Sequence, residues 1–248
     1  MNTWHYPFWI AHRGAGKLAP ENTLAAFRLG AQYGYRMFEC DAKLSADGEV
    51  FLMHDATLER TTNGHGTGGA LNWHQLSQLD AGNWHSRAYA GEPLPRLEAL
   101  ARFCLGNGHF LNIEIKPTPG TERQTGEGVA REAARLWAGQ TVPPLLTSFQ
   151  PEALAGARMA APVLPRGLLL DTLREGWFEQ AQSLGCVAVV CNHALWNPAT
   201  VACVQGAGMR ALSYTVNDDW AAQHLTALGT DGIITDRVDH FSPSKHPA

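Results

Sequence analysis

The sequence has few of the features that mark secreted, membrane or zinc-binding proteins. Its five cysteines are odd in number and scattered, and no C-x-x-C pattern occurs. This usage argues against a disulfide framework and favours a reducing cytoplasm. No stretch approaches the ~20 apolar residues of a membrane span. The residues before His12 also lack the basic start and apolar core of a signal peptide. We therefore expect a cytoplasmic protein without stable membrane association.

Charge is sparse as well. Charged residues make up 17% of the chain and the net charge is −4. A nucleic-acid partner would call for a basic stripe, which is missing, so we expect none. The chain has 248 residues, 45% of them hydrophobic, which suits one large α/β barrel or two smaller domains.

The ionisable residues that are present concentrate between His12 and Asp55, in the motifs HRG, ECD and HD. Glu39 and Asp41 lie two residues apart on a predicted strand, so both side chains leave the same face. Two carboxylates on one face repel each other unless a positive charge lies between them. Carboxylate oxygens suit Mg²⁺ or Ca²⁺, and the spacing therefore predicts a site for one divalent cation.

A hairpin is predicted directly after these carboxylates. The dipeptide Asp47-Gly48 is typical of the two central residues of a type I′ turn. With that turn, Asp41 would lie directly opposite His54 on the same face of the pair. The alternative is a surface hairpin whose histidine is incidental.

Strand-like runs alternate with helical patterns along the rest of the chain. The predicted strands cover 8–11, 36–41, 109–116, 145–149, 166–170, 187–191, 210–216 and 232–235. Eight strands connected through helices are typical of a closed (β/α)8 TIM-type barrel. We expect one such domain over residues 1–248.

An inserted segment is expected after the second strand, at about 55–96. It is too long and too rich in turn residues for an ordinary loop between a strand and a helix. We expect it to fold over one end of the barrel. Its aromatic residues Trp73, Trp84 and Tyr89 either wall a pocket or anchor the insertion to the barrel.

The carboxyl ends of barrel strands carry the chemistry in this fold. Glu114 and Lys116 share one face of the third strand there, and Glu114 supplies a third carboxylate for the metal. Arg13 and Lys116 bring positive charge to the same rim, where they could hold a phosphoryl group. His12 and His54 could supply a base and an acid near neutral pH.

Each of these residues also has a plainer interpretation. Lys116 could form an ordinary ion pair with its neighbour Glu114. Arg13 could brace a helix cap at Glu21, and His54 could be a turn residue. Short motifs match by chance often enough that each interpretation stays open until the geometry is known.

The whole motif series resembles the glycerophosphodiester phosphodiesterase family, in its cytosolic bacterial branch. Between Ile10 and Asp236 the chain reads HRG, PENT, E-x-D, HD, RTTNG, LDAG-x-W, E-I-K, TSF, YTVN and DGIITD, in the family's order. The resemblance implies a (β/α)8 barrel with an insertion after the second strand. One departure is Tyr214, where many members carry tryptophan, so the preferred alcohol headgroup is left open.

The resemblance also implies roles for the candidate residues. Glu39, Asp41 and Glu114 would bind one Mg²⁺ or Ca²⁺, and His12 and His54 would be the acid–base pair. The implied reaction is hydrolysis of small glycerophosphodiesters, such as glycerophosphocholine, to sn-glycerol 3-phosphate and an alcohol. Two alternatives stay open: a lysophospholipase D-like hydrolase of long-chain lysophospholipids, and a non-catalytic phosphate-binding barrel.

Overall fold

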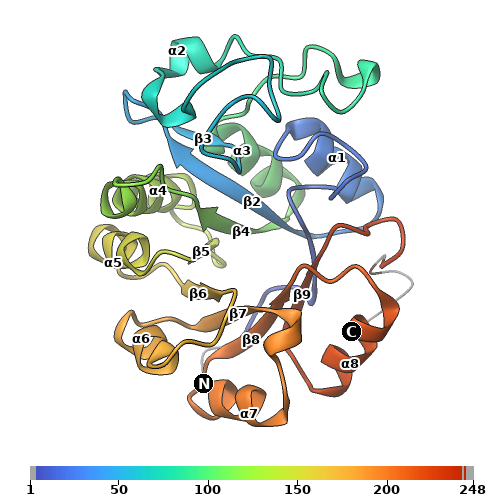
Figure 1. The fold of residues 1–248 in the computed structure, drawn as a ribbon, viewed down its shortest axis with the longest axis vertical. Helices are drawn as coiled ribbons and strands as arrows, with labels where there is room; N and C mark the ends of the chain where they lie inside the picture. Colours follow the sequence, from blue (N-terminus) through green and yellow to red (C-terminus); the bar gives the residue numbers. More distant parts are fainter. Residues whose placement is uncertain (1–3, 242, 244–248) are drawn as a thin grey trace.

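Eight parallel strands close into a barrel in the computed structural model, which describes residues 4–241 and 243 (Figure 1). The barrel strands are β1 (Trp9–Ala11), β2 (Met37–Leu44), β4 (Phe110–Ile115), β5 (Leu145–Ser148), β6 (Arg166–Leu170), β7 (Ala188–Asn192), β8 (Arg210–Tyr214) and β9 (Gly232–Thr235). Strand β1 pairs with both β2 and β9, which closes the barrel. The predicted (β/α)8 fold is therefore confirmed.

Helices surround the barrel on its outer side (Figure 1). They are α1 (Leu24–Gln32), α3 (Leu97–Asn107), α4 (Glu122–Leu136), α5 (Pro151–Ala160), α6 (Trp177–Ser183), α7 (Pro198–Gly206) and α8 (Asp219–Ala227), with a 3₁₀ turn η3 (His193–Leu195) after β7. Among the helices within 4–241 and 243, none combines the length and the apolar character needed to cross a membrane.

The barrel interior is apolar at one end and polar at the other. Its apolar cluster consists of Ile10, Met37, Leu145, Leu169, Ala188, Val190, Leu212 and Ile234. Alternate residues of a strand face the interior, so Met37 lies on the same face of β2 as Glu39 and Asp41. The apolar cluster fills the barrel below the carboxylates, and the acidic groups are left at the carboxyl ends of the strands.

The hairpin after β2 differs from the prediction by one residue. Strand β3 (Val50–Leu52) runs antiparallel to β2 with Leu44 opposite Val50. The Met53 N–H donates to the Asp41 carbonyl oxygen over 2.9 Å. Asp41 therefore faces Met53 in the ladder, and the predicted opposition of Asp41 and His54 is wrong.

The loop chemistry explains the shift. Of the two predicted turn residues, Gly48 alone has positive φ, at 86°, whereas a type I′ turn needs positive φ at both central positions. The Gly48 N–H donates to the Ser45 carbonyl oxygen at 3.0 Å. The connection is thus a three-residue loop with glycine at the left-handed position, and this adds one residue to the hairpin.

The segment between β3 and α3 contains η1 (Gly68–Ala70), α2 (Trp73–Leu76) and η2 (Arg87–Tyr89), and lies beside the ends of β2 and β3 (Figure 1). It packs on a small core of its own: Phe51, Met53, Leu58, Leu76, Ala81 and Leu94. Trp73 lines a cavity of about 330 Å³ between this segment and α3. Tyr89 packs against the main core, and Trp84 is 40% exposed. The three aromatic residues therefore have different roles.

The HRG turn lies directly on helix α1, and two glycines allow the approach. Gly14 has φ of 101°, which an L side chain rarely adopts. A Cβ on Gly30 would lie 2.1 Å from the Gly14 carbonyl oxygen. The contact places the residues just before Gly14, His12 and Arg13, at the barrel rim.

Replacing Gly30 with alanine tests this contact. Alanine favours a helix interior by about 0.5–1 kcal/mol over glycine, but here the added methyl group collides with backbone. We expect Gly30→Ala to lower the free energy of unfolding by roughly 1–3 kcal/mol, the usual cost of overpacking. Gly106→Ala in α3 is the matched control, because no atom lies within 4 Å of its added Cβ. Denaturant unfolding measures both. A Gly30→Ala protein as stable as Gly106→Ala would contradict the close contact.

Candidate active site

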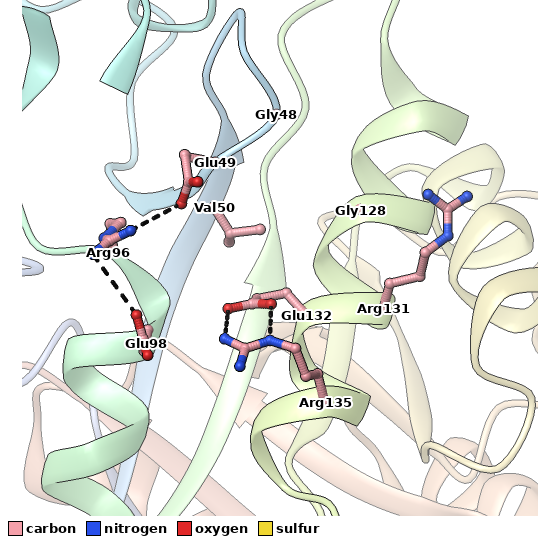
Figure 2. A pocket seen from close by; sticks show the side chains of 9 residues that line it. All are labelled: Gly48, Glu49, Val50, Arg96, Glu98, Gly128, Arg131, Glu132 and Arg135. Carbon is pink, nitrogen blue, oxygen red and sulfur yellow. Dashed lines mark hydrogen bonds and ion pairs between the residues drawn. The ribbon is translucent and has the colours of Figure 1, made fainter. Parts of the chain in front are cut away.

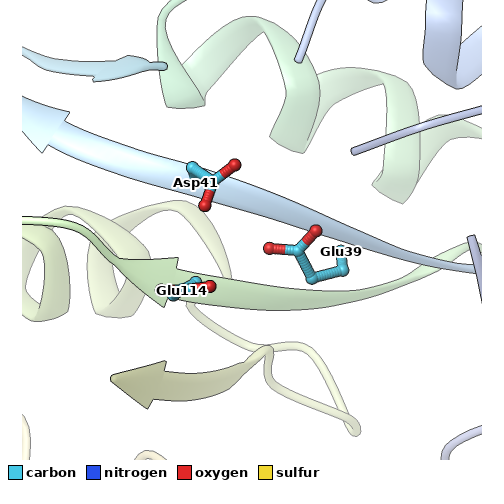
Figure 3. Close-up of side chains that lie close together, drawn as sticks. All are labelled: Glu39, Asp41 and Glu114. Carbon is cyan, nitrogen blue, oxygen red and sulfur yellow. The ribbon is translucent and has the colours of Figure 1, made fainter. Parts of the chain in front are cut away.

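Three buried carboxylates meet inside the barrel, two from the middle of β2 and one from the carboxyl end of β4 (Figure 3). Asp41 and Glu114 are direct partners in the parallel ladder, and Glu39 lies two residues before Asp41. One oxygen from each residue can be chosen so that all three lie within 4.8 Å of one another. Their exposed fractions are 2% for Glu39, 0% for Asp41 and 8% for Glu114. The structure thus brings together the three predicted metal ligands.

The electrostatics of this triad favour a bound cation. Burial and the charges of Asp41 and Glu114 raise the pKa of Glu39 well above its usual value. Burial and the charge of Asp41 raise the pKa of Glu114 to about 7. Burial alone would raise the pKa of Asp41, but the positive charges of Arg13 and His54 lower it. Buried Oε1 of Glu39 and Oδ1 of Asp41 have no hydrogen-bond partner within the described residues. Unpartnered buried oxygens call for a ligand, and a hard divalent cation fits them.

The two predicted phosphate-binding residues lie beside the triad. Lys116 Nζ is 2.7 Å from Glu114 Oε1. Arg13 Nε is 3.2 Å from Asp41 Oδ2, and its Nη1 is 2.9 Å from Glu21 Oε1. The ion pairs Lys116–Glu114 and Arg13–Glu21, which the sequence analysis offered as plainer interpretations, are therefore both present. They also hold both cations at the rim next to the triad.

His12 is held between the triad and a further carboxylate. Its Nδ1 is 2.6 Å from Asp236 Oδ1, and its Nε2 is 3.9 Å from Glu39 Oε2. Asn217 Nδ2 donates to the other oxygen of Asp236. Although burial opposes it, the hydrogen bond and charge of His12 lower the pKa of Asp236 to about 2. An ionised Asp236 favours a proton on Nδ1 and leaves Nε2 facing the triad.

His54 also has a carboxylate partner. Its Nδ1 is 2.7 Å from Asp55 Oδ1. Arg60 in turn donates to both oxygens of Asp55, at 2.5 and 3.0 Å, and to both oxygens of Glu21, at 2.8 and 2.7 Å. Burial lowers the pKa of His54, although the charge of Asp41 opposes it. His54 follows Met53, whose N–H donates to the Asp41 carbonyl oxygen, so the loop after β3 carries the histidine next to the strand of the triad.

Sequence reasoning gave no role to several residues that support this geometry. Asn22 directly precedes Thr23, the residue that caps α1. Asn22 has φ of 59°, and its side chain makes two hydrogen bonds to Asp41, at 2.8 and 3.0 Å. In the sequence, the only sign that Asn22 and Arg60 belong to the site is that they lie in the motifs PENT and RTTNG. The interactions themselves join segments far apart in the sequence.

A charged cavity elsewhere does not belong to this site (Figure 2). It has a volume of about 460 Å³ and lies between the β2–β3 hairpin, α3 and α4. Arg96 pairs with Glu49 and Glu98, and Arg135 pairs with Glu132. None of the predicted site residues lines it.

Comparisons with known proteins match almost the whole chain. The sequence model of the "Glycerophosphoryl diester phosphodiesterase family" matches residues 12–240. A glycerophosphodiester phosphodiesterase of Caldanaerobacter subterraneus subsp. tengcongensis is 31% identical over 92% of this chain and 93% of that protein.

Solved structures agree with this match. An Oleispira antarctica phosphodiesterase in complex with the product sn-glycerol-3-phosphate is 33% identical, with a TM-score of 0.86 over 93% of both chains. A glycerophosphodiester phosphodiesterase of Agrobacterium tumefaciens is 30% identical, with a TM-score of 0.79 over 95% of this chain and 98% of that one.

Replacing Asp236 with asparagine tests the orientation of His12. The variant keeps the shape of the side chain but loses the negative charge that favours a proton on Nδ1. We expect the kcat for phosphodiester hydrolysis to fall by roughly 10²-fold or more, as for a misplaced acid–base group. Steady-state kinetics measures the loss, and ¹⁵N NMR of the imidazole ring reports the tautomer. An Asp236→Asn protein with a changed tautomer but parental kcat would show that Asp236 has no part in catalysis.

Proposed function

The chain belongs to the glycerophosphoryl diester phosphodiesterase family, and from that premise we propose that its rim site hydrolyses glycerophosphodiesters to sn-glycerol 3-phosphate and an alcohol. As a member of the family it is a phosphoric diester hydrolase. The observation that carries the proposed site is the buried triad of Glu39, Asp41 and Glu114 between two histidine–carboxylate pairs. The substrate is proposed to be a small soluble diester.

We propose that Glu39, Asp41 and Glu114 hold one divalent cation, Mg²⁺ or Ca²⁺. The unpartnered oxygens of Glu39 and Asp41 support this assignment, and all three ligands are the hard oxygen donors that both ions prefer. Such a cation supplies charge stabilisation to the phosphoryl group.

His12 and His54 are proposed to move the protons. One takes the proton of the attacking oxygen while the P–O bond to the leaving alcohol breaks. The other gives a proton to the leaving alkoxide. If a water attacks, this step gives sn-glycerol 3-phosphate directly. If the glycerol 2-hydroxyl attacks, it gives a cyclic phosphate, and a water must then attack phosphorus and break the P–O bond to the 2-oxygen to give sn-glycerol 3-phosphate.

Both histidines have a carboxylate on Nδ1, Asp236 for His12 and Asp55 for His54, which leaves Nε2 to exchange the proton. We assign the first-step base to His12 and the acid to His54.

Arg13 and Lys116 are proposed to bind the non-bridging phosphoryl oxygens. Both carry positive charge at the mouth of the triad, and Arg13 also holds the Asp41 carboxylate. Their donors gain most where negative charge develops in the transition state.

A cytoplasmic location and a single barrel domain over 1–248, with its insertion at about 55–96, remain proposals. All five cysteines are free, four of them buried, which suits a reducing compartment. The ends of the 1–248 range lie outside the described residues.

Removing the metal should abolish turnover. We expect no glycerophosphocholine hydrolysis after exhaustive dialysis against EDTA, and recovery when Mg²⁺ or Ca²⁺ is added, because the metal-free triad is three crowded carboxylates. Choline release measures the rate, and long-chain lysophosphatidylcholine serves as the competing substrate. Full activity without metal would refute the metal assignment. Faster turnover of the long-chain lipid would favour the lysophospholipase D-like alternative.

Replacing either histidine should lower the activity without unfolding the protein. We expect His12→Ala and His54→Ala each to lower kcat by roughly 10²–10⁴-fold, the usual range for a positioned acid or base. The double variant should lose less than the product of the two single losses, because groups that act together are not additive. His224→Ala is the control, since His224 lies on α8 away from the triad. A histidine whose variant retained parental kcat would have no part in the mechanism.

A further inference from the structure

Lys43 is a buried basic residue to which the proposed reaction gives no role. It follows Asp41 by two positions on β2, so it shares the face that carries Glu39 and Asp41. Its exposed fraction is 2%. Buried lysines are rare because an ammonium group loses its hydration, so such a residue needs compensating contacts.

The contact that Lys43 makes is to the main chain of Lys116. Lys43 Nζ donates to the Lys116 carbonyl oxygen over 3.1 Å. The Lys116 N–H donates to the carbonyl oxygen of Ala42 over 2.9 Å. Ala42 and Lys43 of β2 therefore bind both polar main-chain groups of Lys116, its N–H and its carbonyl oxygen.

These two hydrogen bonds lie just beyond the end of β4. Strand β4 stops at Ile115, and Lys116 precedes Pro117. Proline offers no N–H and disfavours helical geometry in the residue before it. The main chain of β2 therefore supports the Lys116 N–H, and the Lys43 side chain supports the Lys116 carbonyl oxygen.

The two hydrogen bonds to its main chain fix the position of Lys116, whose side chain points toward the carboxylate triad. Lys116 Nζ lies 2.7 Å from Glu114 Oε1 and 5.3 Å from the centre of the Phe149 ring. A small rotation of the Lys116 main chain would swing this long side chain away from both.

Charges around Lys43 also favour its position. The carboxylates of Asp41, Asp55 and Glu114 attract it, while Lys116 repels it, and burial lowers the pKa of Lys43 to about 8. Both forms of the amine carry N–H groups, so the hydrogen bond to the Lys116 carbonyl oxygen survives a change of charge.

We propose that Lys43 is a positioning residue for phosphodiester hydrolysis, which acts by holding the Lys116 main chain so that the Lys116 ammonium group meets the phosphoryl oxygens. The proposal rests on the phosphate-binding role proposed for Lys116. It assigns no contact between Lys43 and the substrate.

A double-mutant cycle tests the proposal on the metal-loaded enzyme with glycerophosphocholine. We expect Lys116→Met to lower kcat/KM at least tenfold and Lys43→Met to lower it by a similar factor, with most of each loss in kcat. Because Lys43 acts through Lys116, adding Lys43→Met to Lys116→Met should cost less than a further threefold. Lys43→Arg keeps a long donor and should recover part of the loss.

Arg166→Met is the matched control. Arg166 is also a buried cation that donates to main-chain oxygens, those of Leu164 and Leu184 among them, but it lies at the first position of β6, at the other end of the barrel. We expect this variant to lower the melting temperature and leave kcat unchanged at a temperature where it is folded.

Three results would overturn the proposal. They are a Lys43→Met protein with parental kcat/KM, a Lys43→Met loss that multiplies fully with that of Lys116→Met, and a Lys116→Met protein with parental turnover. If Lys43→Met does not fold, Lys43→Gln, which is too short to reach the Lys116 carbonyl oxygen, takes its place in the cycle. Wild-type protein that hydrolyses no glycerophosphodiester would instead refute the proposed function.

Discussion

The mutual repulsion of three buried carboxylates is the constraint on which the site depends. Glu39, Asp41 and Glu114 are all buried, on the two neighbouring strands β2 and β4. Burial, together with this repulsion, raises the pKa of Glu39 and of Glu114. Arg13 and Lys116 compensate part of the charge from the rim. A divalent cation would compensate the remainder, which makes the triad a binding site that is costly to leave empty.

Around this centre, ion pairs join parts of the chain that are distant in sequence. Arg60 from the insertion binds Asp55 and Glu21 together, so the partner of His54 is tied to the loop that carries Arg13. On the other side Asp236, which follows β9, holds His12. His12 thus receives its carboxylate from a distant segment, because barrel closure between β1 and β9 brings His12 and Asp236 to the same end. His54 receives its carboxylate from the next residue, Asp55, which Arg60 holds in turn.

The sequence predicted the parts that depend on local pattern. The alternation of strands and helices was sufficient to predict the barrel. The two-residue spacing of Glu39 and Asp41 was sufficient to predict that their side chains share one face of the strand. The hairpin register could not be predicted, because whether Asp47 adopts positive φ depends on its surroundings. Asn22 and Arg60 were missed for a related reason. Their side chains act through tertiary contacts with Asp41, Asp55 and Glu21, which no periodicity encodes.

Calorimetric titration of Mg²⁺ or Ca²⁺ into metal-stripped protein at pH 7 tests the central claim most directly. Burial and the charges of the neighbouring carboxylates raise the pKa of Glu39 well above its usual value and that of Glu114 to about 7, so a cation competes with protons for the triad. Titration in two buffers of different ionisation enthalpy counts those protons. We expect one ion for each chain, bound with release of protons, and loss of this binding in Asp41→Asn. Binding without proton release, or binding that persists unchanged in Asp41→Asn, would contradict it.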